Sequence, residues 1–525
     1  MSNNNPQKNL LYILLFSFAV LSVYTFLRLP SFFEPVWHND EGLYSAIAGQ
    51  LMQGELLYRD AWDHKPPAIY LIYLLILTIS GSEFYFVIKF INYILGITAI
   101  ALVGYLSFLF LPAKKFNRRL AIVASSGITA FVLGVMWFEA GILNAENIFV
   151  PLVLLGLVFI FSDRNTEQLK YSKMILAGLC FGIAFLVKFH PLLDFLALLL
   201  FLFIDWMRSR WREYGISHAA ISFGLKFYPM LLAFALPMLA SLIYFRFEDA
   251  LDIYFFSIFT FNLGYSSQIF AEIWTFNFYS QIAPWTKALV LTVIVSIVSL
   301  SFWLKKIPRI LFFILLLFSF ETFGALLANR MYFHYFLQMT PGFALLLAYF
   351  ISHRAIRLKL KFSFVILIIV FASFILSLNI KISGEKTLLA EYVSSYYTTA
   401  YRYLAGDASR EEWIDRFFIE QEANEELFGI LGKYEGEKVY IHSRYSWVYA
   451  KYDLDNPSRY FVVAHIRANG AETYLVETIG AEEPKVIATD NSYGIPIGLR
   501  AKIAENYFLV EKAGSDKFMI WERKN

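Results

Sequence analysis

The stretch WHNDEGLYSAIAGQLMQGELLYRDAWDHKPP, residues 37–67, collects acidic and basic side chains between two strongly apolar segments. Apolar residues recur at the spacing of a helix from Leu43 to Leu51. This periodicity predicts a short amphipathic helix over 40–53 that lies on a membrane surface, with Asn39 as its N-cap. The arrangement indicates polar chemistry held next to a membrane.

Asp40 and Glu41 fall in the first turn of this predicted helix. The positive end of the helix dipole keeps carboxylates ionised there, and an ionised carboxylate can serve as a general base. The alternative interpretation is that the two acids only cap the helix, which is their commoner use. The residues alone leave both interpretations open.

The composition indicates an integral membrane protein. The 525 residues are 58% hydrophobic and 17% charged, and several apolar runs reach the ~20 residues that cross a bilayer core as a helix. The first run has no cleavage signature, so we expect it to remain as a span. The single cysteine, Cys180, excludes a disulfide framework, and the net charge of +3 does not suggest nucleic acid as a partner.

Basic segments give the expected topology, because cytoplasmic loops carry an excess of Lys and Arg. The apolar run after Lys65 is too short to cross comfortably, so we predict an interfacial or re-entrant helix over 66–80. Residues 37–67 then lie outside, and the basic segments all fall on the cytoplasmic side. These segments are 113–119, 163–173, 207–213, 305–309 and 353–361.

We predict about eleven spanning helices, another interfacial helix over 249–262, and a polar exterior region from Lys381 onward. The predicted domains are therefore a transmembrane module, 1–380, and an exterior soluble α/β domain, 381–525. In the latter we expect a helix over 410–434, strands at 438–443, 459–465 and 485–490, and a hairpin over 507–523 that turns at Gly514 and Ser515. The predicted spans are Leu10–Leu29, Phe84–Leu111, Leu120–Phe138, Asn147–Phe161, Met174–Phe189, Leu192–Trp206, His218–Phe245, Pro284–Leu304, Ile310–Ala328, His334–Ile351 and Phe362–Ile380.

Polar residues collect at every predicted exterior end of the spans, where membrane proteins seldom keep them without a function. Besides Asp40 and Glu41 they are Glu139, Asn144, Glu146, Lys188, His190, Arg330, His334 and Tyr335. The pattern suits transfer of a sugar from a lipid phosphate to an acceptor hydroxyl at the outer leaflet.

In that reaction the acceptor loses a proton to a carboxylate, for which Asp40 is the first choice and Glu41 the second. Fixed cations stabilise the negative charge of the phosphate leaving group, and Lys65, Lys188 and Arg330 are the candidates. Lys188 and Arg330 have an alternative use, in which they extend to the lipid headgroups.

Aromatic residues in the same loops are candidates for stacking on the sugar or lining the lipid path, and the alternative is that they anchor the chain at the interface. They are Trp37, Tyr58, Trp62, Trp137 and Tyr332. His64, His190 and His334 are spaced unlike any metal-ligand motif. We therefore expect no metal ion and no cofactor.

The segments NDEGLY (39–44) and GELLYRDAWDHKPPAIY (54–70) together resemble the first exterior loop of the GT-C membrane glycosyltransferases. The resemblance is to the group that includes protein O-mannosyltransferases and lipid A aminoarabinose transferases, and it covers 10–380. Three later segments are also similar to that group: LNAENIFVPL (143–152), FLVKFHP (185–191) and RMYFHYFLQMTPGFALLLA (330–348).

The resemblance implies a GT-C module with interfacial helices, a polyprenyl-phosphate sugar donor and an inverting reaction. It places the protein in the plasma (inner) membrane, with the active site and the C-terminal domain on the exterior face. The acceptor would be a glycan, a lipid or a protein. By this similarity Asp40 matches the catalytic acid. The residues expected to bind donor phosphate or substrate are Lys65, Glu146, Lys188, Arg330, His334, Tyr335, Tyr58 and Arg59.

Two other functions remain open. A transporter or flippase for a lipid-linked glycan also needs polar residues among many spans, although transporters usually place them near the membrane midplane. A non-catalytic scaffold whose exterior domain binds glycan is the third possibility.

Overall fold

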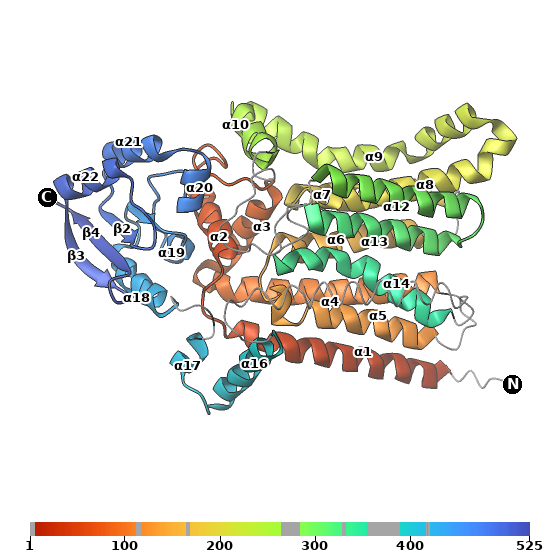
Figure 1. Cartoon of the computed structure of the whole chain (residues 1–525), viewed down its shortest axis with the longest axis horizontal. Coiled ribbons are helices and arrows are strands. Elements are labelled where there is room, and N and C mark those ends of the chain that lie inside the picture. The colour runs from red at the N-terminus through yellow and green to blue at the C-terminus, as the bar shows by residue number, and fades with distance from the viewer. Residues whose placement is uncertain are drawn as a thin grey trace. The chain divides into compact units, whose positions relative to one another are not determined.

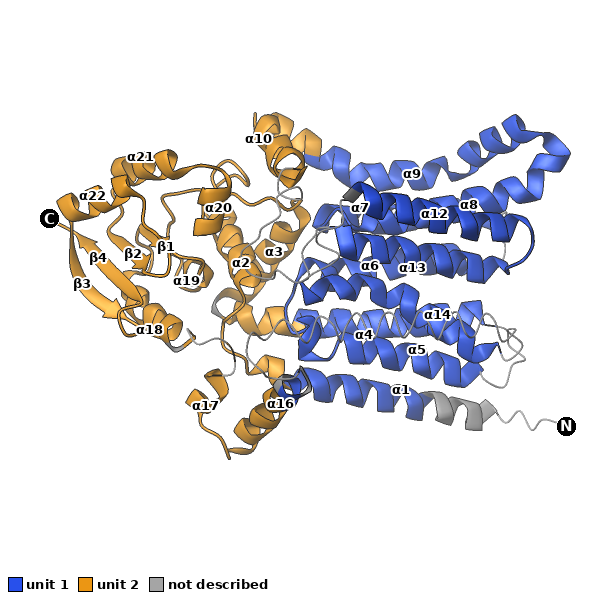
Figure 2. Cartoon of the chain, viewed as in Figure 1, with its two compact units in different colours: residues 1–29, 91–241, 266–394 blue, residues 30–90, 242–265, 395–525 orange. Residues whose placement is uncertain are grey.

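The computed structural model describes residues 6–111, 118–163, 168–263, 284–327, 332–353, 389–415, 417 and 421–524, and it is mainly helical (Figure 1). The chain forms two compact units (Figure 2). Unit 1 contains 1–29, 91–241 and 266–394, and unit 2 contains 30–90, 242–265 and 395–525. The predicted domain boundary at 380/381 lies outside the described residues, and that division stays a prediction.

Unit 1 is a bundle of apolar helices. Its helices are α1 (Pro6–Arg28), α5 (Arg118–Val132), α6 (Ala145–Phe161), α7 (Tyr171–Val187), α8 (Pro191–Tyr214), α12 (Pro284–Trp303), α13 (Arg309–Leu327) and α14 (Thr340–Ser352), with most of α4 (Phe84–Phe110) and α9 (Ile216–Phe247). Among the described residues, six helices are long and apolar enough to cross a membrane. They are Leu14–Phe32, Phe84–Phe110, Ile216–Phe247, Trp285–Trp303, Arg309–Leu327 and Phe333–Ser352.

Small residues and ring clusters hold this bundle together. Gly178 and Gly182 on α7 face the α9 backbone at Met230 and Phe234, where a β-carbon would collide. Absence of that carbon lets the two helices approach closely, a common device in membrane bundles. Elsewhere the Phe161 ring packs 4.5 Å from that of Phe313, measured between centroids.

The predicted spans coincide with helices wherever the structure describes them, with three differences. The predicted span Leu120–Phe138 is an α-helix only as far as Val132, where α5 ends. A short 3₁₀ turn, η3 (Met136–Phe138), follows it. The helix α8 continues through the basic segment to Tyr214, and a 3₁₀ segment, η6 (Phe333–Met339), precedes α14. The predicted span Phe362–Ile380 lies outside the described residues, so the number of spans stays a prediction.

Unit 2 combines a helical part with a small sheet. The helical part contains α2 (Asn39–Met52), α3 (Ala68–Ser80), the first turns of α4, and α10 (Leu251–Phe255), which continues as a π-helical turn, η5 (Phe256–Thr260). The helices of its C-terminal part are most of α16 (Leu389–Ala405), α17 (Arg410–Ile414), α18 (Gln421–Leu431), α19 (Trp447–Lys451), α20 (Val463–Ala468), α21 (Glu472–Glu482) and α22 (Ile497–Asn506). The predicted helices at 66–80 and 249–262 are thus confirmed as helical, while their interfacial placement stays a prediction.

The sheet has the strand order β1-β2-β4-β3. Its strands are β1 (Val439–His442), β2 (Val486–Asp490), β3 (Tyr507–Ala513) and β4 (Phe518–Arg523). β1 and β2 are parallel, and β3 and β4 form the predicted hairpin around Gly514, whose φ of +61° suits glycine. The helix predicted over 410–434 is divided into α17 and α18.

The strand predicted at 459–465 is wrong, because α20 begins at Val463. Tyr460, Phe461 and Val463 are buried. The periodicity of apolar residues cannot distinguish a strand from a helical turn when the apolar run is short and buried.

Two expectations about α2 are also wrong. His38 occupies the N-cap, and Asn39 is already the first helical residue. The helix does not lie on a surface with one face exposed, because every residue from Glu41 to Gln50 is buried within the protein. The helices α3 and α19 pack against it, and Gly42 lies against the Trp447 ring, 2.6 Å from where a β-carbon would stand.

Candidate active site

Asp40 and Lys65 come together in unit 2, as the sequence suggested. Asp40 stands in the first turn of α2, and Lys65 lies in the loop between α2 and α3. The Lys65 Nζ lies 3.8 Å from the Asp40 Oδ2, and the Tyr44 hydroxyl donates a hydrogen bond of 3.3 Å to the same oxygen. The ammonium also lies 4.7 Å from the centroid of the Tyr44 ring. The Asp40 side chain remains 35% exposed and that of Lys65 17% exposed, so both groups can be reached from outside the protein.

The loop that carries Lys65 is fixed by Tyr58. This residue adopts a φ of +70°, and its hydroxyl donates a 2.8 Å hydrogen bond to the Lys65 carbonyl. Its ring is buried against Tyr70 and Tyr254. Arg59 instead is 55% exposed and pairs with Asp60 at 2.9 Å. The structure therefore places Tyr58 beneath the loop and Arg59 on its outside, while their predicted substrate contacts stay untested.

Glu41, the second choice for the base, has a different environment. Its carboxylate lies 3.1 Å from the Lys89 Nζ, and each side chain is only 1% exposed. The same ammonium lies 3.7 Å from Glu34, which also accepts a hydrogen bond from Tyr396. Glu41 is thus enclosed in a buried ion-pair network. Sequence reasoning missed Lys89 and Glu34 because they sit in or beside apolar runs.

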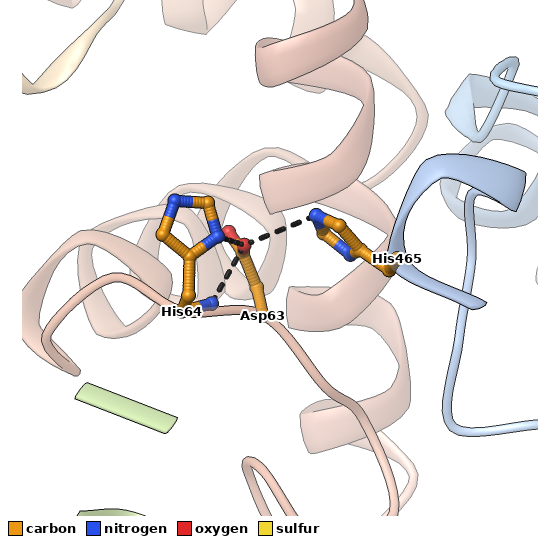
Figure 3. A group of neighbouring side chains, drawn as sticks. All are labelled: Asp63, His64 and His465. Carbon is orange, nitrogen blue, oxygen red and sulfur yellow. Dashed lines mark hydrogen bonds and ion pairs between the residues drawn. The ribbon is translucent and has the colours of Figure 1, made fainter. Parts of the chain in front are cut away.

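A third group in unit 2 joins residues far apart in the sequence (Figure 3). Asp63 Oδ1 lies 2.8 Å from the His64 Nδ1 and 3.5 Å from the Nε2 of His465 on α20. Burial alone would raise the pKa of Asp63, but the neighbouring His64 and Lys65 hold it well below its usual range. Burial lowers the pKa of His465 to about 4. An ionised carboxylate therefore faces an imidazole that is neutral at pH 7.

Unit 1 brings together a separate polar cluster, which includes four of the residues predicted to bind donor phosphate or substrate. The Lys188 Nζ lies 2.5 Å from the Glu146 Oε1 and 4.2 Å from the centroid of the Tyr335 ring. His334 packs edge-on against Tyr335, at 4.8 Å between ring centroids, and its Nδ1 lies 2.5 Å from the Glu139 carboxylate. Arg330 lies outside the described residues. The four gathered residues are Glu146, Lys188, His334 and Tyr335.

Unit 1 also buries two carboxyl groups that sequence reasoning missed. Asp194 on α8 and Glu321 on α13 are fully enclosed and close enough to interact. The Glu321 carboxylate accepts a 2.8 Å hydrogen bond from the Gly342 amide. Both acids lie within predicted membrane spans to which no function was assigned. The one signal in the sequence was that an acidic residue is unusual inside an apolar helix.

Comparison with known proteins gives an independent view of the fold. The family profile for dolichyl-phosphate-mannose-protein mannosyltransferase matches residues 64–232. Among solved structures, ArnT from Cupriavidus metallidurans bound to undecaprenyl phosphate aligns with 97% of this chain and 97% of its own, at 11% identity and a TM-score of 0.50. The oligosaccharyltransferase AglB from Archaeoglobus fulgidus, in complex with an inhibitory peptide and a dolichol-phosphate, aligns with 98% of this chain and 74% of its own, at 12% identity and a TM-score of 0.47. A search of curated proteins found no match.

The alignment with ArnT over nearly the whole of both chains gives this protein the GT-C fold. The predicted fold class, a polytopic helical membrane protein with a C-terminal α/β region, is confirmed. The profile match and the fold together confirm the resemblance to the GT-C membrane glycosyltransferases.

Proposed function

We propose that this protein is an inverting membrane glycosyltransferase that moves a sugar from a polyprenyl phosphate to an acceptor hydroxyl. The observation that carries the proposal is the Asp40–Lys65 pair, a reachable carboxylate held 3.8 Å from an ammonium. The acceptor oxygen attacks the anomeric carbon, the bond from that carbon to the phosphate oxygen breaks, and Asp40 takes the acceptor proton. Lys65 stabilises the negative charge left on the lipid phosphate.

The geometry favours Asp40 over Glu41 as the base. A base must come within hydrogen-bond reach of the proton that it removes. Asp40 is 35% exposed, whereas Glu41 is 1% exposed and already paired with Lys89. The contacts with Tyr44 and Lys65 orient Asp40 before substrate arrives.

The class of donor is inferred by analogy with ArnT, which was crystallised with undecaprenyl phosphate. We place the protein in the plasma (inner) membrane. The distribution of basic segments supports an orientation in which the Asp40–Lys65 site and the C-terminal region face the exterior. Candidate acceptors are a protein hydroxyl, a lipid such as lipid A, and another polyprenyl-linked glycan.

The decisive experiment incubates the purified protein in nanodiscs with a panel of radiolabelled polyprenyl-phosphate sugars and the three classes of acceptor. We expect one donor to be consumed, with release of polyprenyl phosphate and label on an acceptor. Heat-denatured protein is the blank. The proposal is overturned if no donor in the panel is consumed and the intact donor instead moves from one leaflet to the other in proteoliposomes. That result would identify a flippase.

The polar cluster of unit 1, which contains Glu146, Lys188, His334 and Tyr335, is tested separately as a donor-binding group. Lys188→Met removes the ammonium that touches Glu146 and Tyr335. Since a hydrogen bond to a charged group contributes about 1.5–3 kcal/mol, we expect the KM for the donor to rise by about 10–100-fold.

Lys173→Met is the matched control for Lys188→Met, because Lys173 also pairs with an acid in unit 1, at 2.6 Å from Asp163. Its KM should equal that of the wild type. An unchanged KM in the Lys188 variant, with thermal stability preserved, would remove this cluster from donor binding.

A further inference from the structure

We propose that Asp63, His64 and His465 form a binding site for a divalent transition-metal ion, best suited to zinc. One donor atom from each residue lies within 4.8 Å of the other two (Figure 3). All three residues belong to unit 2, with Asp63 and His64 in the α2–α3 loop and His465 on α20. The inference stands apart from the proposed transfer reaction.

The donor set and its spacing fit zinc. Two imidazole nitrogens and a carboxylate oxygen are common zinc ligands, at about 2.0–2.2 Å from the ion. Tetrahedral coordination at such lengths places neighbouring donor atoms about 3.4 Å apart. The Asp63 Oδ1 lies 2.8 Å from the His64 nitrogen and 3.5 Å from the His465 nitrogen, which brackets that separation.

The surroundings hold the ligands in place. The Tyr70 hydroxyl donates a 2.6 Å hydrogen bond to the Asp63 Oδ2, and the His64 amide donates one of 2.7 Å to the Oδ1. Groups that hold a metal-binding carboxylate in this way are typical of metal sites. The ring of His465 packs against Trp62, at 5.0 Å between centroids. Asp63 is fully buried, and the two histidines are 16% and 12% exposed.

The position of the site suggests what the ion would do. Lys65 directly follows His64, so an ion here would fix the loop that presents Lys65 to Asp40. It would also tie α20 of the C-terminal region to that loop, because His465 comes from α20. Three protein ligands leave a fourth tetrahedral position for water or another ligand.

The test measures metal in the full-length protein, purified through a tag without histidine. We expect zinc by elemental analysis in proportion to protein, and restored binding when chelator-stripped protein is titrated with Zn²⁺ or Co²⁺. Asp63→Asn and His465→Ala should each weaken binding at least 10-fold. His218→Ala is the matched control, since His218 is exposed at the start of α9 and should not affect retention.

A third ligand variant tests the site even if Asp63→Asn and His465→Ala fail to fold. His465→Cys keeps a zinc ligand, so it should bind Co²⁺ and add a thiolate-to-cobalt absorption band. The proposal is overturned if the folded wild type binds neither Zn²⁺ nor Co²⁺, if the His218 variant loses metal equally, or if folded Asp63 and His465 variants bind as the wild type does. None of these readouts requires turnover.

Discussion

Asp40→Asn should lower kcat for sugar transfer by about 10²–10⁴-fold, the usual contribution of a general base. The amide keeps the size of the side chain and can still accept the Tyr44 hydrogen bond, but it cannot take the acceptor proton. Lys65 keeps its position on the loop through the Tyr58 hydrogen bond. The KM for the donor should therefore change much less than kcat. The measurement is initial-rate kinetics with the donor identified from the panel.

The matched control for Asp40→Asn is Asp516→Asn. Asp516 also pairs with a lysine, Lys512 at 2.9 Å, but it lies at the exposed turn of the C-terminal hairpin. Its kcat should equal that of the wild type. If the folded Asp40 variant keeps turnover within a few-fold, Asp40 serves only to orient α2 and Lys65, and the base must be sought elsewhere.

The membrane helices and the gathering of several candidate residues could be predicted from the sequence. Long apolar runs have few alternatives to a helix in a bilayer, so the bounds of α4 and α12 agree with the predictions to within one residue. Asp40 and Lys65 meet because a single helix and a loop separate them. Glu146 and Lys188 likewise stand at adjacent ends of α6 and α7, which pack together.

Partners from distant parts of the sequence could not be predicted. The periodicity of α2 resembles that of a surface helix, and only α19, hundreds of residues later, shows that Gly42 is covered by Trp447. For the same reason, the spacing of His64 gave no sign of His465. His38, and not Asn39, occupies the N-cap. Its carbonyl accepts a 2.8 Å hydrogen bond from the Trp447 indole, a partner that the local sequence does not reveal.

The buried network around Lys89 predicts the largest effect on stability. Lys89→Met should lower the free energy of unfolding by about 3–5 kcal/mol, the usual cost of removing one partner from a buried ion pair. The substitution preserves the apolar stem but removes the ammonium that lies 3.1 Å from the buried Glu41 carboxylate and 3.7 Å from that of Glu34. Thermal unfolding of the purified protein in one detergent, followed by tryptophan fluorescence, measures the difference.

Two further variants show whether unpaired charge causes that loss. Lys438→Met removes a lysine that also pairs with an acid, Glu482 at 2.6 Å, but at a partly exposed position, so it should cost less than about 1 kcal/mol. Adding Glu41→Gln to Lys89→Met removes the charge of one of the two carboxylates that lie beside Lys89. The double variant should recover part of the lost stability, because the effects of substitutions at contacting residues on the free energy of unfolding do not simply add. A single Lys89 variant as stable as the wild type would mean that water or lipid headgroups already compensate these carboxylates, and that α2 is held by Trp447 and its apolar neighbours instead of by charge.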